Sequence, residues 1–140
     1  MQIPLTETRK TARHQREAQE QAALFQWARM QRTYPGLDLL FAIPNGAYLQ
    51  GGAAQRAAQW AKLARQGARK GVHDVFLPVP MQGHRGLWIE MKAPKPHAAD
   101  VSEEQAEWLR LMVGQGYAAH IAYGWQEAVG IINLYYGREK

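Results

Sequence analysis

The chain has 140 residues, of which 46% are hydrophobic and 21% charged, so its length and composition suit one folded domain with a real core. No apolar run approaches the roughly 18 residues that a membrane span needs, and no signal peptide is recognisable, so we expect a cytoplasmic protein without a membrane partner. The net charge of +5 favours a polyanion such as nucleic acid, and the lack of cysteine excludes disulfides, thiolate metal ligands and cysteine nucleophiles.

The first elements are an arm, a helix and a strand. Residues 1–14 are polar and basic, and we predict a flexible arm there, followed by a single domain over residues 15–140. Apolar residues at helical spacing predict an amphipathic helix over 15–31. The run "LDLLFAI" at 37–43 is short and apolar, as a buried strand would be, and "PNG" then breaks it.

A second helix is predicted at about 53–66, inside a segment of one-signed charge. Residues 51–73 contain no acid and five basic residues: Arg56, Lys62, Arg65, Arg69 and Lys70. A helix with this charge could lie along nucleic-acid phosphates, so we predict that these five side chains bind DNA. An ordinary basic surface is the alternative.

The second half of the chain alternates strands and helices. "HDVFLPVP" and "LWIEMK" read as two strands of a hairpin that turns at "MQGHRG". A capping box at Ser102 and Gln105 begins a helix that ends near Gly116. "YAAHIAY" is a strand, and "WQEAVGIINLYYG" is the closing helix. The order α-β-α-β-β-α-β-α predicts an α/β fold with a mixed sheet flanked by helices.

An acid and an amine lie close together in "LWIEMK". Because side chains alternate along a strand, Glu90 and Lys92 share one face, which we expect to line a cleft while the other face is buried. The predicted hairpin brings Asp74 beside them. Two facing carboxylates repel unless a cation lies between them, and oxygen ligands favour Mg²⁺ or Mn²⁺. For Glu-x-Lys taken alone, a surface ion pair is the alternative.

These residues resemble the PD-(D/E)XK nuclease superfamily, with a restriction-endonuclease-like core. More narrowly, the chain resembles the VRR-NUC family, and especially its small stand-alone phage and prophage members. The similar pieces span residues 17 to 130 in the expected order: "EAQEQAALFQWA", "FAIPNGAYLQGG", "GVHDVFLPVP", "GLWIEMKAPK" and "SEEQAEWLRLMVGQGYAAHIAYGWQEA". One departure is His73, which occupies a position where the family usually has proline. It leaves the local backbone, and thus the placement of Asp74, less fixed.

The resemblance implies roles for individual residues. Asp74 and Glu90 would bind the metal together with the Met91 backbone carbonyl, and Lys92 would be the catalytic lysine. A glutamate of the first helix would complete the acidic set. Glu17 aligns better than Glu20 with the family's E-x-x-x-Q, but the sequence leaves both candidates open, and a solvated charge near the start of the helix is the alternative for each.

Two further positions match the family and have structural alternatives. Gln105 matches the family's catalytic glutamine, but as the third residue after the Ser102 cap it would bond the Ser102 backbone, and we expect one role to exclude the other. The resemblance places Asn45 and Gly46 in a cleft near DNA, whereas the residue types alone indicate only a turn.

The function implied by the resemblance is metal-dependent endonuclease activity on DNA, without an organic cofactor. The small stand-alone members imply a homodimer that cuts branched DNA such as four-way (Holliday) junctions in a bacterial or phage-infected cell, since a two-fold dimer supplies two symmetric cuts. Two alternatives of another class remain: a non-catalytic nucleic-acid-binding module, and an interaction protein that uses exposed aromatic residues.

Overall fold

The computed structural model of the protein describes residues 5–44 and 49–139. Within these residues the chain forms four α-helices, one 3₁₀ helix and four strands. In chain order they are α1 (Leu5–Met30), η1 (Leu37–Leu39), β1 (Phe41–Ala42), α2 (Ala53–Arg65), β2 (Val75–Leu77), β3 (Leu87–Lys92), α3 (Glu103–Gly114), β4 (Ala118–Tyr123) and α4 (Trp125–Tyr135). This is the predicted order with a 3₁₀ turn added.

The four strands form one mixed sheet in the order β1-β2-β3-β4. β2 pairs with β3 in the predicted antiparallel hairpin, with Val75 opposite Ile89 and Leu77 opposite Leu87. β1 adds to β2 in the antiparallel sense, and β4 pairs with β3 in parallel after the α3 crossover. The sheet is therefore mixed because a hairpin and a β-α-β unit share the strand β3.

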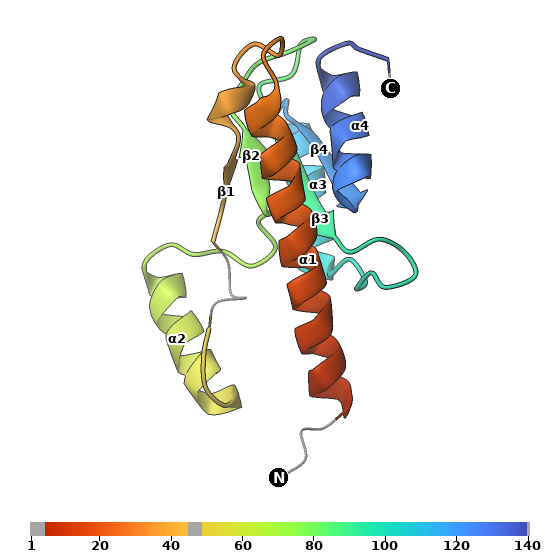
Figure 1. Ribbon diagram of the computed structural model, residues 1–140. Coiled ribbons are helices and arrows are strands. Elements are labelled where there is room, and N and C mark those ends of the chain that lie inside the picture. Colours follow the sequence, from red (N-terminus) through yellow and green to blue (C-terminus); the bar gives the residue numbers. More distant parts are fainter. Residues whose placement is uncertain (1–4, 45–48, 140) are drawn as a thin grey trace.

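Helices cover both faces of this sheet (Figure 1). On one face, the buried Leu24 of α1 and Ile132 of α4 belong to the same core cluster as Ile89 and Met91 of β3. On the other face, Trp88 meets Trp108 of α3 edge to face at 5.2 Å between ring centroids. The predicted alternation of β3 is thus confirmed, but α3 covers the face that was expected to line a cleft.

The predicted start of the first helix is wrong. α1 begins at Leu5, so residues 5–14 are helical where a flexible arm over residues 1–14 was predicted. The sequence has no glycine or proline between Leu5 and Met30, and a helix that has formed extends at little cost until a residue stops it. Residues 1–4 lie outside the described part of the chain.

The apolar run at 37–43 is mostly a turn of 3₁₀ helix instead of a strand, with only Phe41–Ala42 paired in the sheet. Leu37 and Leu40 are buried, whereas Leu39 is 54% exposed. Burial three residues apart is the spacing of one helical turn, and a run of seven residues is too short to separate this pattern from a strand.

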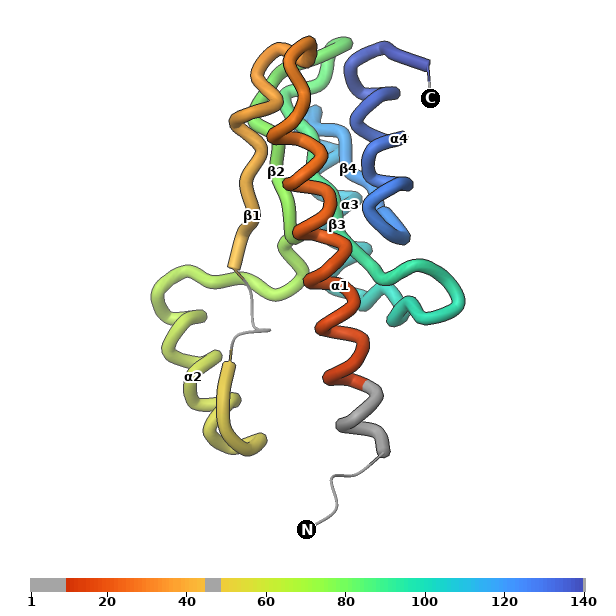
Figure 2. Tube along the Cα trace, in the orientation of Figure 1, coloured from red at the N-terminus to blue at the C-terminus, as the bar shows by residue number. Residues whose placement is uncertain are grey.

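Between β1 and β2 the chain leaves the sheet, forms α2 and returns (Figure 2). No residue of α2 is buried. No helix within the described residues has the length and hydropathy to cross a membrane.

Candidate active site

The site forms at the open end of the β2-β3 hairpin. Asp74 directly precedes β2, and the register continues so that it lies opposite Glu90. Asp74 Oδ2 accepts a hydrogen bond from the Met91 backbone nitrogen at 2.9 Å. Because the N–H and C=O of one strand residue point to the same side, the Met91 carbonyl also points toward the edge where Asp74 lies. The hairpin therefore places two carboxyls and one backbone carbonyl together.

Glu90 is almost fully buried, with 3% of its surface exposed. Burial raises the pKa of Glu90 to about 9, with the negative charge of Asp74 adding to the rise and Lys92 opposing it. Its Oε1 atom is buried, and no donor among the described residues reaches it. The Glu90 carboxyl therefore lacks positive partners on the side away from Lys92.

Gln105 of α3 joins Glu90 to Lys92. Its Nε2 atom donates to Glu90 Oε2 at 3.0 Å, while its Oε1 atom accepts from Lys92 Nζ at 2.9 Å. Lys92 Nζ also lies 3.6 Å from Glu90 Oε2, and both side chains are about 5% exposed or less. The three groups form a closed triangle in which the amide fixes both charged partners.

Gln105 also caps its own helix. Its Oε1 atom accepts from the Ser102 backbone nitrogen at 3.0 Å, and its backbone nitrogen donates to Ser102 Oγ at 3.1 Å. An amide oxygen has two lone pairs, so one Oε1 serves the cap and Lys92 together. The expectation that capping and facing the site exclude each other is therefore wrong.

The two glutamates of α1 have different surroundings. Glu17 is half-buried and close enough to Lys92 and Asp74 to feel their charges: burial raises its pKa, Lys92 opposes the rise and Asp74 adds to it. Glu20 Oε2 instead accepts a hydrogen bond from the Trp125 backbone nitrogen at 2.8 Å, at the first residue of α4. The structure thus brings Glu17 toward the cluster and Glu20 to a helix terminus.

His73 is completely buried beside Asp74. Its Nε2 atom lies 3.1 Å from the Gln105 backbone carbonyl oxygen, and burial lowers its pKa, so the neutral ring donates this bond. His73, two residues before β2, therefore binds α3 through its side chain at the position where the resemblance expects proline. No pattern in the sequence indicates this contact, or the contact of Glu20 with α4.

The remaining predictions concern the residues expected to contact DNA. Asn45 and Gly46 are outside the described residues. The five basic residues of the segment 51–73 are all exposed, on α2 and on the linker that follows it.

A divalent cation fits the donor set on chemical grounds. Asp74, Glu90 and the Met91 carbonyl are hard oxygen donors, and a cation would satisfy the buried Glu90 Oε1 atom. Within the described residues, no three acidic or histidine side chains are grouped closely enough to enclose a metal. Mg²⁺ keeps several waters and is commonly held by only one or two carboxylates.

Taken together, a mixed sheet between helices and a carboxyl-lysine cluster at the end of its hairpin define a protein of the PD-(D/E)XK nuclease class. The family model of the VRR-NUC domain matches residues 15–126. A solved structure described as a "VRR_NUC domain protein" is similar with a TM-score of 0.71 and 21% identity, over 89% of this chain and 90% of that one. No curated protein matches. The chain belongs to the VRR-NUC family, a family of nuclease domains that generally use divalent metal ions.

Proposed function

We propose that the protein is a metal-dependent DNA endonuclease that hydrolyses phosphodiester bonds with Mg²⁺ or Mn²⁺. The observation that carries this proposal is the buried Glu90 carboxyl, which faces Asp74 with its Oε1 atom unsatisfied by any described donor. Burying an acid beside a second acid is costly unless a proton or a cation lies between them, and a protein that only binds DNA has no need of that arrangement.

The carboxyl groups of the site are the proposed metal ligands. Asp74, Glu90 and the Met91 carbonyl would hold the cation, and Glu17, which feels the charges of Lys92 and Asp74, would complete the acidic set. When bound, such a cation polarises a phosphoryl oxygen and lowers the pKa of water. In the overall reaction, the hydroxyl of a water molecule adds to phosphorus, the bond to the leaving oxygen breaks, and the leaving oxygen receives the proton.

Lys92 supplies the positive charge of the site. Gln105 and Glu90 fix two of the directions of its ammonium group, which has three N–H donors. The third would donate to the attacking water or to the phosphoryl oxygen on which negative charge develops. Gln105 is a positioning residue here, since it acts by holding Lys92 and Glu90.

The favoured substrate is branched DNA such as a four-way junction, cut by a homodimer in the cytoplasm of a bacterial or phage-infected cell. The support is the VRR-NUC domain over residues 15–126 and its one carboxyl-lysine cluster: one such domain carries one site, and two symmetric cuts require two sites. Sedimentation at the concentration of the cleavage assay tests this point, and a monomer that cuts junctions symmetrically would contradict it.

Cleavage assays with two site variants test the activity. Asp74→Asn and Lys92→Met should each reduce cleavage of junction and linear DNA by at least about a hundredfold in Mg²⁺ or Mn²⁺. Asp38→Asn is the matched control, because Asp38 is an exposed acid on η1, away from the cluster. Full activity in both site variants would reject the proposal.

A further inference from the structure

The helix α2 stands apart from the rest of the described structure. Figure 1 shows it below and to the side of the sheet, and none of its residues is buried. It makes at most slight contact with any other helix or strand. An isolated helix of 13 residues is marginally stable in water, so little in the chain itself fixes this helix.

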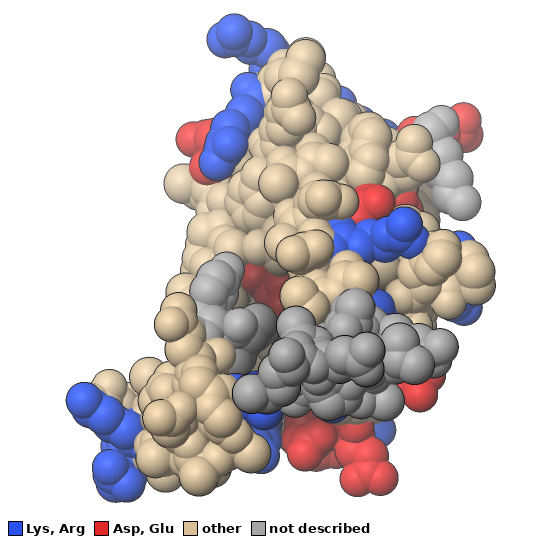
Figure 3. Space-filling model, turned by 60° about the horizontal axis from the view of Figure 1, so that its bottom comes forward, with Lys and Arg blue, Asp and Glu red and all other residues tan. Residues whose placement is uncertain are grey.

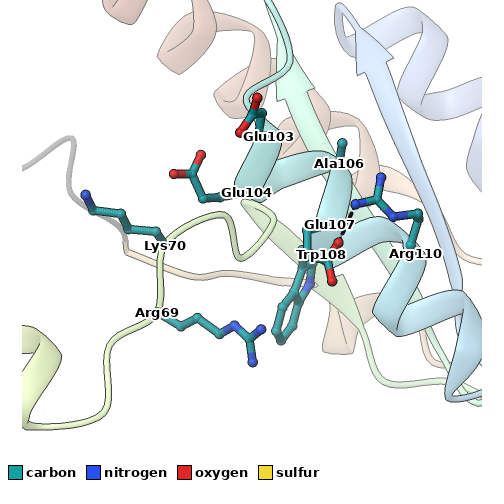
Figure 4. Close-up of a pocket in the computed structure, with 8 residues that line it drawn as sticks. All are labelled: Arg69, Lys70, Glu103, Glu104, Ala106, Glu107, Trp108 and Arg110. Carbon is teal, nitrogen blue, oxygen red and sulfur yellow. Dashed lines mark hydrogen bonds and ion pairs between the residues drawn. The ribbon is translucent and has the colours of Figure 1, made fainter.

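The chain around α2 carries charge of one sign, although its last two cations, Arg69 and Lys70, line a pocket together with Glu103, Glu104 and Glu107 of α3 (Figure 4). The α2 segment, defined as residues 51–70, carries Arg56, Lys62, Arg65, Arg69 and Lys70 and no acid. All five are exposed, and none forms an ion pair with a described residue. Figure 3 shows basic side chains on the lobe at the lower left that contains α2, and acidic atoms recessed in a hollow beside it. A nearby polyanion would relieve the mutual repulsion of these cations.

The spacing of the charges suits an extended anion. Lys62 and Arg65 are three residues apart and therefore neighbours on one side of the helix, and Arg69 and Lys70 follow in the linker. Arg56 lies nine residues before Arg65 and so on the opposite side. One side of α2 therefore carries Lys62 and Arg65, about 4.5 Å apart along the helix axis, with Arg69 and Lys70 beyond the end of the helix.

The residues that follow α2 pack against α3, which carries Gln105 of the site. Gly71 has a φ of +87°, and a Cβ there would lie 2.3 Å from the Glu104 backbone carbonyl, so only glycine permits this approach to α3. Arg69 lies over the Trp108 ring, 5.5 Å from its centroid, as Figure 4 shows. Asp74 follows three residues after Gly71. A polyanion bound to α2 therefore lies next to the hairpin end that carries the carboxyls.

We propose that the α2 segment binds the backbone of duplex DNA that flanks the phosphodiester being cut. This proposal rests on the proposed function for the identity of the polyanion. A second copy of this chain is a poorer occupant, because two surfaces of the same positive charge repel each other.

A binding experiment without cleavage tests it. The probe is a fluorescently labelled 30-base-pair duplex, and binding is followed by anisotropy in Mg²⁺ from low to moderate salt, in the Lys92→Met background. The variant Lys62→Gln/Arg65→Gln should weaken binding at least about tenfold at low salt. It should also lower the slope of log affinity against log salt by about 2, since each lost phosphate contact contributes roughly 0.9.

The matched control removes two positive charges elsewhere. Arg29→Gln/Arg32→Gln changes exposed residues at and beyond the far end of α1 and should keep the salt slope of the parent. Equal losses in both double variants, or an unchanged slope in the α2 variant, would overturn the proposal. So would a change in sedimentation without a change in DNA affinity, which would assign the surface to a second copy.

Failure of this proposal and failure of the proposed function give different results. If the wild-type chain cuts DNA while the α2 variant binds as tightly as its parent, only the role of α2 is wrong. If the α2 variant loses affinity but the wild-type chain cuts no DNA in any divalent metal, the α2 segment binds DNA and the nuclease proposal is wrong.

Discussion

Gln105 Oε1 accepts a hydrogen bond from Lys92 Nζ at 2.9 Å while also accepting one from the Ser102 backbone nitrogen at 3.0 Å. The first turn of α3 is therefore anchored to β3 through one amide oxygen. Any change in the position of this turn moves the group that orients Lys92. Helix capping and arrangement of the site are coupled at this one residue.

The two roles of Gln105 can be separated by substitution. Gln105→Ala removes the bonds to Glu90 and Lys92 together with half of the capping box, and cleavage should fall about ten- to a hundredfold, as when partners of metal ligands are lost. Ser102→Ala removes only the cap and should cost about 1 kcal/mol of unfolding free energy with a smaller loss of activity. Urea unfolding and cleavage rates measure both effects. Equal activity losses in the two variants would mean that Gln105 acts only as a cap.

The two glutamates of α1 should behave in opposite ways. Glu17→Ala should reduce cleavage at least about tenfold without loss of stability, because a half-buried acid with a raised pKa does not stabilise the fold. Glu20→Ala should cost about 1–2 kcal/mol of unfolding free energy, because it leaves the start of α4 without its acceptor. Cleavage at saturating metal and urea unfolding distinguish the two. A stability loss in Glu17→Ala with unchanged cleavage would reverse this assignment.

The sequence predicts this site well where local rules decide the outcome. Strand alternation places Glu90 and Lys92 on one face, and the hairpin register follows from the two apolar runs and the turn between them. The capping box is readable because Ser102 and Gln105 are three residues apart. These features depend on neighbours in the chain or on one strand pairing, and the structure has each of them.

Contacts between distant parts of the chain are not predicted by the sequence. Glu17 and Glu20 lie on the same helix three residues apart, and only the packing of α1 against α4 and the sheet gives them different partners. His73 meets the Gln105 carbonyl 32 residues away, a contact that has no local pattern. The isolation of α2 is a similar case, because its apolar and basic residues read like those of any surface helix.

The raised pKa of Glu90 predicts a pH dependence of stability without metal. Glu90 titrates near 9 when folded and near 4.5 when unfolded, so between these values the native state holds a proton that the unfolded chain releases. The unfolding free energy should therefore fall as pH rises through this window, by at most about 1.4 kcal/mol per pH unit. Urea unfolding in a chelator measures it.

Glu90→Gln is the control for this pH effect. It removes the titrating group and keeps the shape, so the decline between pH 4.5 and 9 should flatten. His73 has a lowered pKa, so its effect on the unfolding free energy has the opposite sign. Its stabilising contribution is present above pH 6.5 and is lost as pH falls below that value. The difference between wild type and Glu90→Gln isolates the carboxyl from this histidine. An identical pH profile in the two proteins would show that Glu90 is not protonated in the folded chain.

Metal binding should reverse the fall in unfolding free energy that the raised pKa of Glu90 causes as pH rises. A cation that binds the native site and not the unfolded chain adds about 2.7 kcal/mol of unfolding free energy at a concentration one hundred times its Kd. Mn²⁺ or Mg²⁺ should therefore stabilise the wild-type chain, and more strongly at pH 8 than at pH 6, because the proton on Glu90 competes with the metal. Asp74→Asn should abolish this gain, whereas Asp38→Asn should keep it. Equal stabilisation of both variants by the metal would place the cation elsewhere on the protein.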